Sequence, residues 1–276
     1  MLRFIPTPTS SKIGIGPFTI HFYALCIISG IVIAIWLGDR RYRASGGAEH
    51  VVADVAIAAV PAGIIGGRIY HLITSPDAYF GSNGHPLDAF KIWNGGLGIW
   101  GAVALGTYVS WWRLKSLRKS GRSGILSFAI FADALAPGVL FAQAIGRFGN
   151  WFNGELFGRP TTLPWGLEIP PALRPLGYEQ FATFHPTFLY ESLWCGAVAC
   201  ALIALEKKFS PGQSFTFYIG AYCIGRFFFE MLRIDTAHAI LGLRVNVWVS
   251  VLVALCAVTL FIVQGRTWRR SQSGSI

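Results

Sequence analysis

The sequence predicts an all-α integral membrane protein, a polytopic bundle of about seven transmembrane helices with its N-terminus outside and its C-terminus cytoplasmic. Three observations support this fold class. Of the 276 residues, 53% are hydrophobic and only 13% are charged, about half the charged share of a soluble domain. Long apolar runs recur along the chain, and the positive residues gather in alternate connecting segments. Both patterns are typical of a multi-pass membrane protein.

Seven segments have nearly the length that a membrane-spanning helix needs, which is about 20 apolar residues. They are 18–37, 51–73, 95–112, 128–145, 188–205, 214–231 and 245–263. The third and fourth are short and rich in glycine. No further soluble segment stands out, so we expect a single membrane domain over 1–276.

The distribution of Lys and Arg predicts the orientation. The segments after the first, third, fifth and seventh predicted helices hold thirteen of the 23 positive residues, and the other connecting segments hold eight. Because positive residues favour the cytoplasmic side, the N-terminus is expected outside and the C-terminus in the cytoplasm. The longest loop, 147–187, then lies on the outer face.

Several other classes of protein are disfavoured. The net charge of +10 comes from short loops and forms no continuous basic face, which argues against nucleic-acid binding. The N-terminal segment has no A-x-A cleavage site and its apolar run is too long for a signal peptide. The five cysteines lie in apolar segments without a CxxC pair, so we expect neither disulfides nor a metal site. No cofactor motif is present.

Ionisable residues inside the predicted spans are candidate functional residues, because each costs roughly 2.5–3.5 kcal/mol on insertion scales. They are Asp54, Arg68, Asp133, Glu191, Arg226 and Glu230.

Arg226 and Glu230 are four residues apart and share a helix face. They are interpreted either as an internal ion pair that ties the bundle together or as a pair in which Glu230 orients Arg226 toward an anion. Asp54 and Asp133 are interpreted as structural, with Asp133 capping the fourth helix. Arg68, after the small residues of IIGG, is compatible with either role.

The segment GRFGNWFNGELFGRP, 146–160, concentrates polar residues in an apolar chain. Arg147 and Arg159 would lie near the outer headgroup level, and Arg226 could reach the same cavity. Guanidinium groups match phosphate oxygens bidentately, so a phospholipid headgroup is the expected ligand. Snorkelling arginines are the alternative, but they leave the neighbouring polar side chains of Asn150, Asn153 and Glu155 unexplained.

Two histidines lie on the same predicted side as these arginines. His21 is at the outer start of the first predicted helix, and His185 opens the HPTFLYE segment. A lone histidine is more often a satisfied structural residue than a ligand, so both interpretations stay open.

The 146–160 segment closely resembles the hallmark of prolipoprotein diacylglyceryl transferases, and the resemblance extends along nearly the whole chain. The other matching segments are IHFYAL at 20–25, IIGGR at 64–68, IWNGGLGIWGA at 92–102, HPTFLYE at 185–191 and AYCIGRFFFEMLRID at 221–235.

The resemblance implies a seven-helix enzyme of the bacterial plasma (inner) membrane. Such enzymes transfer the diacylglyceryl group of phosphatidylglycerol to the lipobox cysteine of a preprolipoprotein signal peptide, form a thioether and release glycerol phosphate. It also implies a functional Tyr23 and an essential Arg226. One position departs from the pattern, because Trp100 stands where the family carries a histidine in SFHGG. A mechanism with that histidine as base is therefore in doubt.

The hypothesised site has Arg147 and Arg226 around the phosphate, with Tyr23 and Glu155 as further catalytic residues. Glu155, then His21, then the leaving phosphate are the candidate acceptors of the thiol proton. The further predicted substrate-binding residues are Asn150, Asn153, Gly158, Arg68, Tyr222, Glu230, His185 and His21.

Two other functions stay open: a transporter or flippase for anionic lipids, and a lipoprotein-assembly subunit without chemistry. Transport predicts a polar path to the cytoplasmic side, whereas the polar residues here crowd the outer half. An assembly subunit would not need an arginine inside a span.

Overall fold

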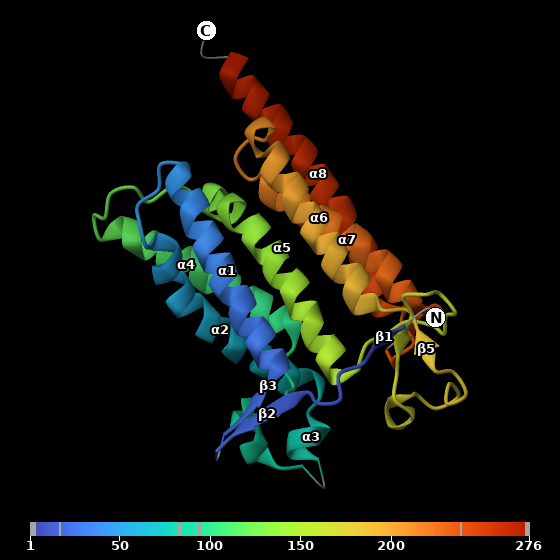
Figure 1. Cartoon of the computed structure of the whole chain (residues 1–276). Helices are drawn as coiled ribbons and strands as arrows, with labels where there is room; N and C mark the ends of the chain where they lie inside the picture. The colour runs from blue at the N-terminus through green and yellow to red at the C-terminus, as the bar shows by residue number, and fades with distance from the viewer. Residues whose placement is uncertain (1–3, 17, 82–83, 93–94, 238, 274–276) are drawn as a thin grey trace. The chain divides into compact units, whose positions relative to one another are not determined.

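The computed structural model describes residues 4–273 except 17, 82–83, 93–94 and 238 (Figure 1). Trp93 and Asn94 of the IWNGGLGIWGA segment therefore lie outside the described residues. The contacts divide the chain into two compact units, one with residues 1–38 and 132–276 and the other with residues 39–131. The sequence led us to expect one membrane domain.

Seven long helices are present among the described residues, one for each predicted span. They are α1 (Phe22–Ala44), α2 (Val51–Thr74), α4 (Ile99–Lys119), α5 (Phe128–Asn153), α6 (Thr187–Leu205), α7 (Gln213–Leu232) and α8 (Val245–Ser273). The short helices α3 (Asp77–Phe80), η1 (Pro86–Phe90), η3 (Pro171–Leu173) and η4 (Glu206–Lys208) lie in the connections.

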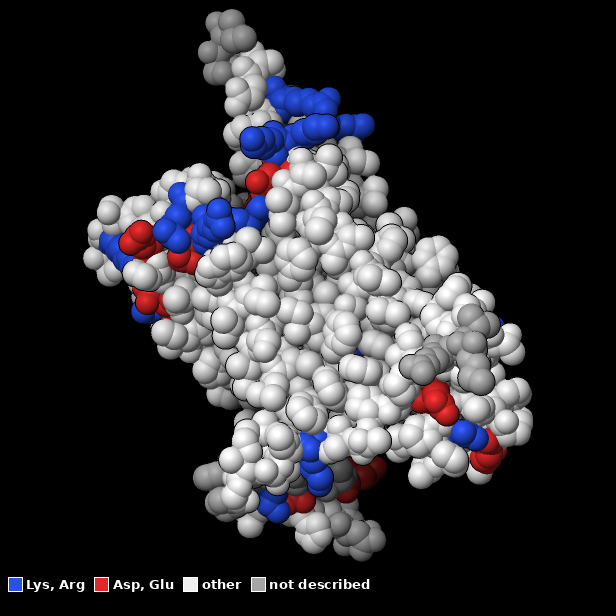
Figure 2. Space-filling view, in the orientation of Figure 1, with Lys and Arg blue, Asp and Glu red and all other residues white. Residues whose placement is uncertain are grey.

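Five helical segments of the described chain are long and apolar enough to cross a membrane: α1, α2, α5, α8 and Thr187–Lys208. The chain is thus a mostly helical, multi-pass membrane protein. Helices α4 and α7 have similar lengths, 21 and 20 residues, but lower hydropathy, because α4 ends in several Lys and Arg and α7 contains Arg226 and Glu230. Figure 2 shows uncharged surface over most of the helices and charged residues near their ends.

Short strands add a small β component to the predicted all-α fold. Strands β1 (Ile5–Pro6), β4 (Leu167–Glu168) and β5 (Thr183–Phe184) form one sheet, with β1 parallel to β4 and β4 antiparallel to β5. Strands β2 (Lys12–Ile15) and β3 (Phe18–His21) form a hairpin, as do β6 (Ala239–Ile240) and β7 (Leu243–Arg244). These pairings satisfy backbone groups in the segments that flank the helices.

Two boundaries differ from the sequence prediction in ways that matter for the site. The first helix begins at Phe22 rather than at residue 18, because 18–21 pairs with β2. Helix α5 continues beyond residue 145 to Asn153, so the predicted outer loop 147–187 begins with two helical turns. Gly154, with φ of 60°, then takes the left-handed conformation that commonly ends a helix.

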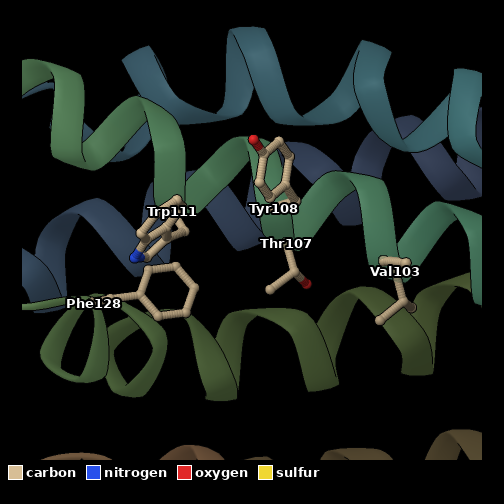
Figure 3. Close-up of a pocket in the computed structure, with 6 residues that line it drawn as sticks. Val103, Thr107, Tyr108, Trp111 and Phe128 are labelled. Carbon is tan, nitrogen blue, oxygen red and sulfur yellow. The ribbon is translucent and has the colours of Figure 1, made fainter.

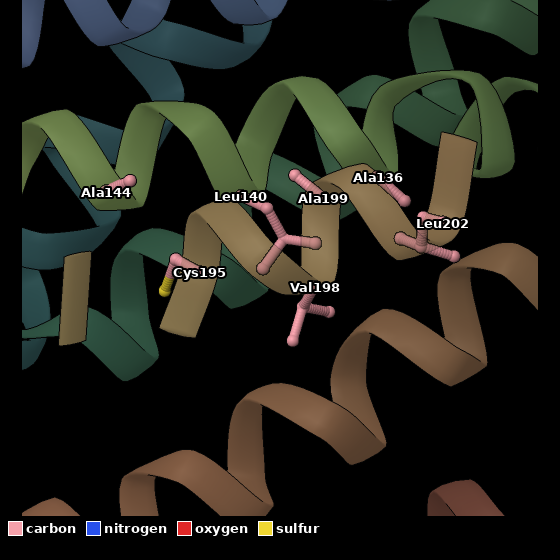
Figure 4. Close-up of a cluster of buried hydrophobic side chains, with 7 residues drawn as sticks. All are labelled: Ala136, Leu140, Ala144, Cys195, Val198, Ala199 and Leu202. Carbon is pink, nitrogen blue, oxygen red and sulfur yellow. The ribbon is translucent and has the colours of Figure 1, made fainter. Parts of the chain in front are cut away.

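The core of the larger unit lies between α5, α6 and α7 (Figure 4). Leu140, Ala199 and Leu202 are fully buried there. Small residues alternate with large ones, which lets the helices approach closely. One end of each helix is thereby brought to the same place, and these ends carry the polar residues of the predicted site.

A second core lies beneath the segment that follows α5. Its buried residues are Phe157, Leu167, Ile169, Phe184 and Phe188. The Trp151 ring stacks on Phe188 with centroids 5.7 Å apart. The 154–186 segment is therefore packed against α5 and α6.

In the smaller unit, α2 and α4 pack through glycines. A Cβ atom at Gly101 would clash with the carbonyl oxygen of Gly66, whereas a Cβ at Gly106 on the same helix would meet its nearest neighbour at 3.6 Å. The backbones of α2 and α4 therefore approach most closely at Gly101.

We expect Gly101→Ala to lower the apparent midpoint of thermal unfolding in detergent, because the added methyl must push α4 away from α2. The matched control is Gly106→Ala, which adds the same methyl in ordinary van der Waals space and gains about 1 kcal/mol of helix propensity. Equal midpoints for the two variants would contradict the close approach of α2 and α4 at Gly101.

Candidate functional site

The centre of the candidate site is one glutamate oxygen that contacts two arginines. Glu191 Oε2 lies 2.9 Å from Arg147 Nη2 and 3.6 Å from Arg226 Nη1. The three residues come from α6, α5 and α7, and the Glu191 side chain is only 5% exposed. The structure thus brings Arg147 and Arg226 together, and the group that joins them is Glu191.

A second carboxylate holds the other side of Arg226. Its Nη2 lies 2.5 Å from Glu230 Oε2, one helical turn further along α7. Glu230 is completely buried, so its charge depends on this partner and its neighbours. The predicted Arg226–Glu230 pair is thus present as an ion pair, in a geometry that also orients Arg226.

The ion pairs continue beyond Glu230 to the end of α7 and to β7. Arg233 and Arg244 both contact Glu230, and both also contact Asp235. Burial alone would raise the pKa of Asp235, but the two guanidinium groups hold it below its ordinary value. Asp235 is therefore ionised at neutral pH.

The residues joined by these ion pairs are Arg147, Arg226, Arg233, Arg244, Glu191, Glu230 and Asp235, which we call the arginine network. Four positive and three negative charges leave it with a net charge of +1. A buried network with one surplus positive charge is suited to bind one monovalent anion.

The last turn of α5 places a carboxylate close to the network. Asn150 Nδ2 and Asn153 Nδ2 each donate to Glu155 Oε1 at 3.0 Å. These two bonds fix the carboxylate and leave Glu155 Oε2 without a partner among the described residues. Asn150 is buried and Glu155 is exposed, so the carboxylate is reachable from outside the bundle.

Two tyrosines extend the site. The Tyr222 hydroxyl accepts a hydrogen bond of 3.3 Å from Arg147 Nη2. The Tyr23 ring lies against Gly149, where a Cβ atom would clash with it, and its hydroxyl interacts electrostatically with both Glu155 and Arg147. Both predicted tyrosines thus lie beside the predicted arginine, and Gly149 makes room for one of them.

Two further predicted residues have structural partners. Gly158 is buried, and its N–H donates to the carbonyl of His185 at 2.9 Å. An added Cβ would lie 2.9 Å from His185 Cβ, so no side chain fits there. His185 Nδ1 lies 3.1 Å from the Tyr190 hydroxyl, and burial lowers the histidine pKa. This keeps His185 neutral at physiological pH.

Two residues that the sequence placed near the phosphate lie apart from the network. Arg159 is exposed, and its guanidinium has no partner among the described residues. Its backbone N–H donates to the Leu232 carbonyl, and its backbone carbonyl accepts from the His185 N–H. His21 is exposed in β3, opposite Lys12. The interpretation of Arg159 as a third phosphate-binding arginine is not supported by its position.

Arg68 belongs to the smaller unit, and all of its guanidinium N–H groups already donate hydrogen bonds within the protein. Its five guanidinium N–H groups donate to the carbonyls of Asp88, Ala89, Lys91, Gly95 and Gly96. Its side chain is buried and fixes the segment between η1 and α4. Of its two open interpretations, this geometry favours the structural one over substrate binding.

Asp54 and Asp133 have the structural roles that we expected, with one correction. Asp54 forms an ion pair with Arg122. Asp133 accepts from the backbone N–H groups of Gly212 and Phe215, at 2.5 and 2.8 Å. It therefore caps the start of α7 rather than its own helix α5.

Two pockets lie in the smaller unit. The larger, about 490 Å³, is lined by Val103, Ala104, Thr107, Tyr108, Trp111 and Phe128 (Figure 3). No carboxylate, histidine or basic group lines it, so it offers no reaction chemistry. The smaller, about 280 Å³, adjoins Arg68, His71 and Asp88. Arg68 is bonded as above, His71 pairs with Tyr79, and Asp88 pairs with Lys91.

No group of three His, Cys, Asp or Glu side chains that could hold a metal ion occurs in the part of the chain that the structure describes. The five cysteines are all free thiols. The side chains described above offer guanidinium, carboxylate, amide and phenol groups at the site.

Four members of the network were absent from the predicted site. Glu191 stood out as an ionisable residue in a span, and Arg147, which had no predicted acidic partner on its own helix, was a signal that Glu191 should join an arginine. Arg233, Asp235 and Arg244 lie in a connection that the sequence marks as polar. Nothing in their spacing shows that β7 returns to the end of α7.

Comparison with known proteins gives a consistent result. The family profile described as "Prolipoprotein diacylglyceryl transferase" matches residues 10–263. The chain is 53% identical over 264 residues to phosphatidylglycerol–prolipoprotein diacylglyceryl transferase 2 of Streptomyces coelicolor, covering 95% of this chain and 81% of the relative. It is 49% identical over 273 residues to the corresponding transferase of Cutibacterium acnes, covering 98% and 90%.

We expect Glu191→Gln to destabilise the protein by about 3–5 kcal/mol, because it leaves Arg147 and Arg226 buried without their shared counter-charge. Thermal unfolding in detergent measures the change. The matched control is Glu168→Gln, the same substitution at an exposed glutamate of β4, which should leave the midpoint unchanged. If both variants unfold with the wild-type midpoint, Glu191 does not hold the two arginines.

Proposed function

Because this chain belongs to the prolipoprotein diacylglyceryl transferase family, we propose that it transfers the diacylglyceryl group of phosphatidylglycerol to a cysteine thiol of a preprolipoprotein. The observation that carries the proposal is the arginine network, in which Glu191 holds the guanidinium groups of Arg147 and Arg226 together, in an arrangement suited to bind one phosphodiester. The proposed acceptor is the lipobox cysteine of the signal peptide.

Arg147 and Arg226 are proposed to bind the phosphate. Glu191 holds them at one place before substrate arrives, so little reorganisation is needed. The thiolate attacks the glyceryl carbon that bears the phosphate, and the carbon–oxygen bond breaks. The products are a thioether and glycerol phosphate, whose phosphate gains a negative charge. Fixed guanidinium groups stabilise that developing charge.

The thiol proton needs an acceptor, because a free thiol has a pKa near 8.5 and is mostly protonated at neutral pH. We propose Glu155, whose Oε2 is not occupied by the two asparagines. Tyr23 lies near this carboxylate and is proposed to donate to a phosphate oxygen. His21, exposed in β3, and the leaving phosphate are the alternative acceptors.

The remaining predicted residues have supporting roles in this proposal. Tyr222 fixes Arg147 and Glu230 fixes Arg226. Asn150 and Asn153 fix Glu155 and are placed to meet the headgroup hydroxyls. Gly158 and His185 shape the backbone beneath the site and are not proposed to contact substrate.

We propose a seven-span topology in the bacterial plasma membrane, with the site on the outer face. The positions of Lys and Arg support this orientation, because the C-terminal ends of α1, α4 and α8 carry basic residues. The thiol of an exported protein and outer-leaflet lipid would meet on that side. A transporter is the alternative, but the arginine network lies at one end of α5, α6 and α7.

Transfer of labelled diacylglycerol from phosphatidylglycerol to a lipobox peptide by the purified protein tests the proposal. We expect Arg226→Ala to lose about 10²–10³-fold in kcat, the typical cost of removing one donor to a developing oxyanion. The matched control is Arg159→Ala, which removes an exposed guanidinium nearby and should leave turnover near wild type. Normal turnover in Arg226→Ala would exclude its proposed role at the phosphate.

Trp100 tests whether the family histidine acts as a base. Its side chain is 46% exposed, so Trp100→His should fold. Since Glu155 is proposed as the proton acceptor, we expect the pH dependence of kcat to match wild type. A new ionisation near pH 6.5, the ordinary pKa of histidine, with faster turnover would instead assign the base to position 100.

A further inference from the structure

Glu230 has more cationic partners than one carboxylate can hold equally. Arg226 lies at 2.5 Å, Arg244 at 2.9 Å and Arg233 at 3.7 Å from its oxygens. Asn246 Nδ2 adds a hydrogen bond of 3.2 Å. Arg233 shares Oε2 with Arg226, whereas Arg244 and Asn246 contact Oε1. The hold of Glu230 on Arg226 therefore depends on where Arg233 lies, and on how much of the carboxylate charge Arg244 neutralises.

Asp235 forms ion pairs with the same two arginines, Arg233 and Arg244, that also contact Glu230. Arg233 binds it through two nitrogens, at 2.7 and 2.8 Å, and Arg244 Nη2 lies 2.8 Å away. No contact joins Asp235 to Arg226 among the described ion pairs. Asp235 thus shares the cations that compete with Arg226 and leaves Arg226 to Glu230 and Glu191.

Arg244 lies in β7, in the β6–β7 hairpin that connects α7 to α8. Leu241 and Gly242, with φ of 52° and 77°, form its tight turn between β6 and β7. Both residues have positive φ, as the favoured two-residue hairpin turns require. Trp248 Nε1 donates to the Ile240 carbonyl at 3.0 Å, which fixes the hairpin to the start of α8. Arg244 therefore reaches Glu230 from a rigid element.

We propose that Asp235 and Arg244 are positioning residues for the phosphate-binding Arg226, and that their two opposite charges tune how strongly the site attracts a phosphate monoanion. This inference rests on the proposed function. Neither residue touches the substrate in the proposal. Asp235 acts by keeping Arg233 from displacing Arg226 at Glu230 Oε2 and by sharing the charge of Arg244.

Charge balance separates this role from a purely structural one, because the two residues have opposite charges. Asp235→Asn leaves the network at +2, and its amide no longer draws the two arginines from Glu230. Arg244→Gln leaves the network at 0. A phosphate monoanion is attracted more strongly in the first case and less strongly in the second. A structural role predicts that both variants are impaired in the same way.

The experiment measures kcat and KM for phosphatidylglycerol in mixed micelles, with a lipobox peptide as acceptor. We expect Asp235→Asn to lower kcat, because Arg226 is held less firmly, while KM falls or stays constant. We expect Arg244→Gln to raise KM on the order of tenfold, the effect of one unit charge about 10 Å away at an effective dielectric of about 20. The double variant restores +1, and its KM should return toward wild type.

Two conservative variants guard against misfolding as an explanation. Arg244→Lys keeps the charge but loses the planar fork, so its KM should stay well below that of Arg244→Gln. Asp235→Glu keeps the carboxylate and should recover part of the kcat that Asp235→Asn loses. Each variant is assayed only if its thermal unfolding shows a single cooperative transition.

The inference is overturned if the two neutralising variants shift KM in the same direction, or if Arg244→Lys raises KM as much as Arg244→Gln. It is also overturned if Asp235→Asn has wild-type kcat and KM. If wild-type protein transfers no diacylglycerol, the proposed function itself fails. Transfer by wild type without opposite KM shifts contradicts the positioning role alone.

Discussion

The shared contact of Arg147 and Arg226 with Glu191 is the interaction on which the rest of the site depends. Two guanidinium groups would repel each other at this separation in an apolar bundle, where a full charge is expensive to bury. A carboxylate oxygen between them, at 2.9 and 3.6 Å, makes the arrangement possible. It also ties α5, α6 and α7 together at the end where the polar residues gather.

The packing of the larger unit follows from this constraint. Small and large side chains of α5 and α6 interdigitate in the cluster around Leu140 and Ala199 (Figure 4). Residues of α7 pack against this cluster, so the helix ends are placed by apolar contacts. The aromatic core around Phe157 and Phe184 then covers the segment after α5. The network sits between two packed regions, and its arginines have little freedom to move away from one another.

Much of the helical fold could be predicted from apolar segment length. The end of α5 could not, because hydropathy falls at Arg147 while the helix continues to Asn153. The polar residues in those last turns are compatible with a helix because they find partners: Glu191 for Arg147 and Glu155 for Asn150. Hydropathy averaged over a stretch of sequence includes the free-energy cost of burying a polar side chain. It does not include the partner whose interaction offsets that cost.

For the site, the sequence indicated which residue types carry chemistry but not how their bonds are distributed. Arg68 and Arg226 are both arginines inside predicted spans, yet one gives all its N–H groups to backbone carbonyls and the other binds two carboxylates. The difference lies in what surrounds each side chain. Arg68 faces a loop with free carbonyls, whereas Arg226 faces acidic residues of its own helix and of α6. Only three-dimensional neighbours distinguish a structural cation from one that can bind an anion.

The same reasoning explains why a site for one phosphate needs so many charges. A single buried arginine would be stabilised only when substrate is bound, and would be an uncompensated charge in the empty enzyme. Three carboxylates among four arginines keep the network stable without substrate and still leave one positive charge for the anion. Because the carboxylates hold the guanidinium groups in place beforehand, the stabilisation of the leaving phosphate costs little reorganisation. Stability of the empty site and readiness for catalysis thus come from the same ion pairs.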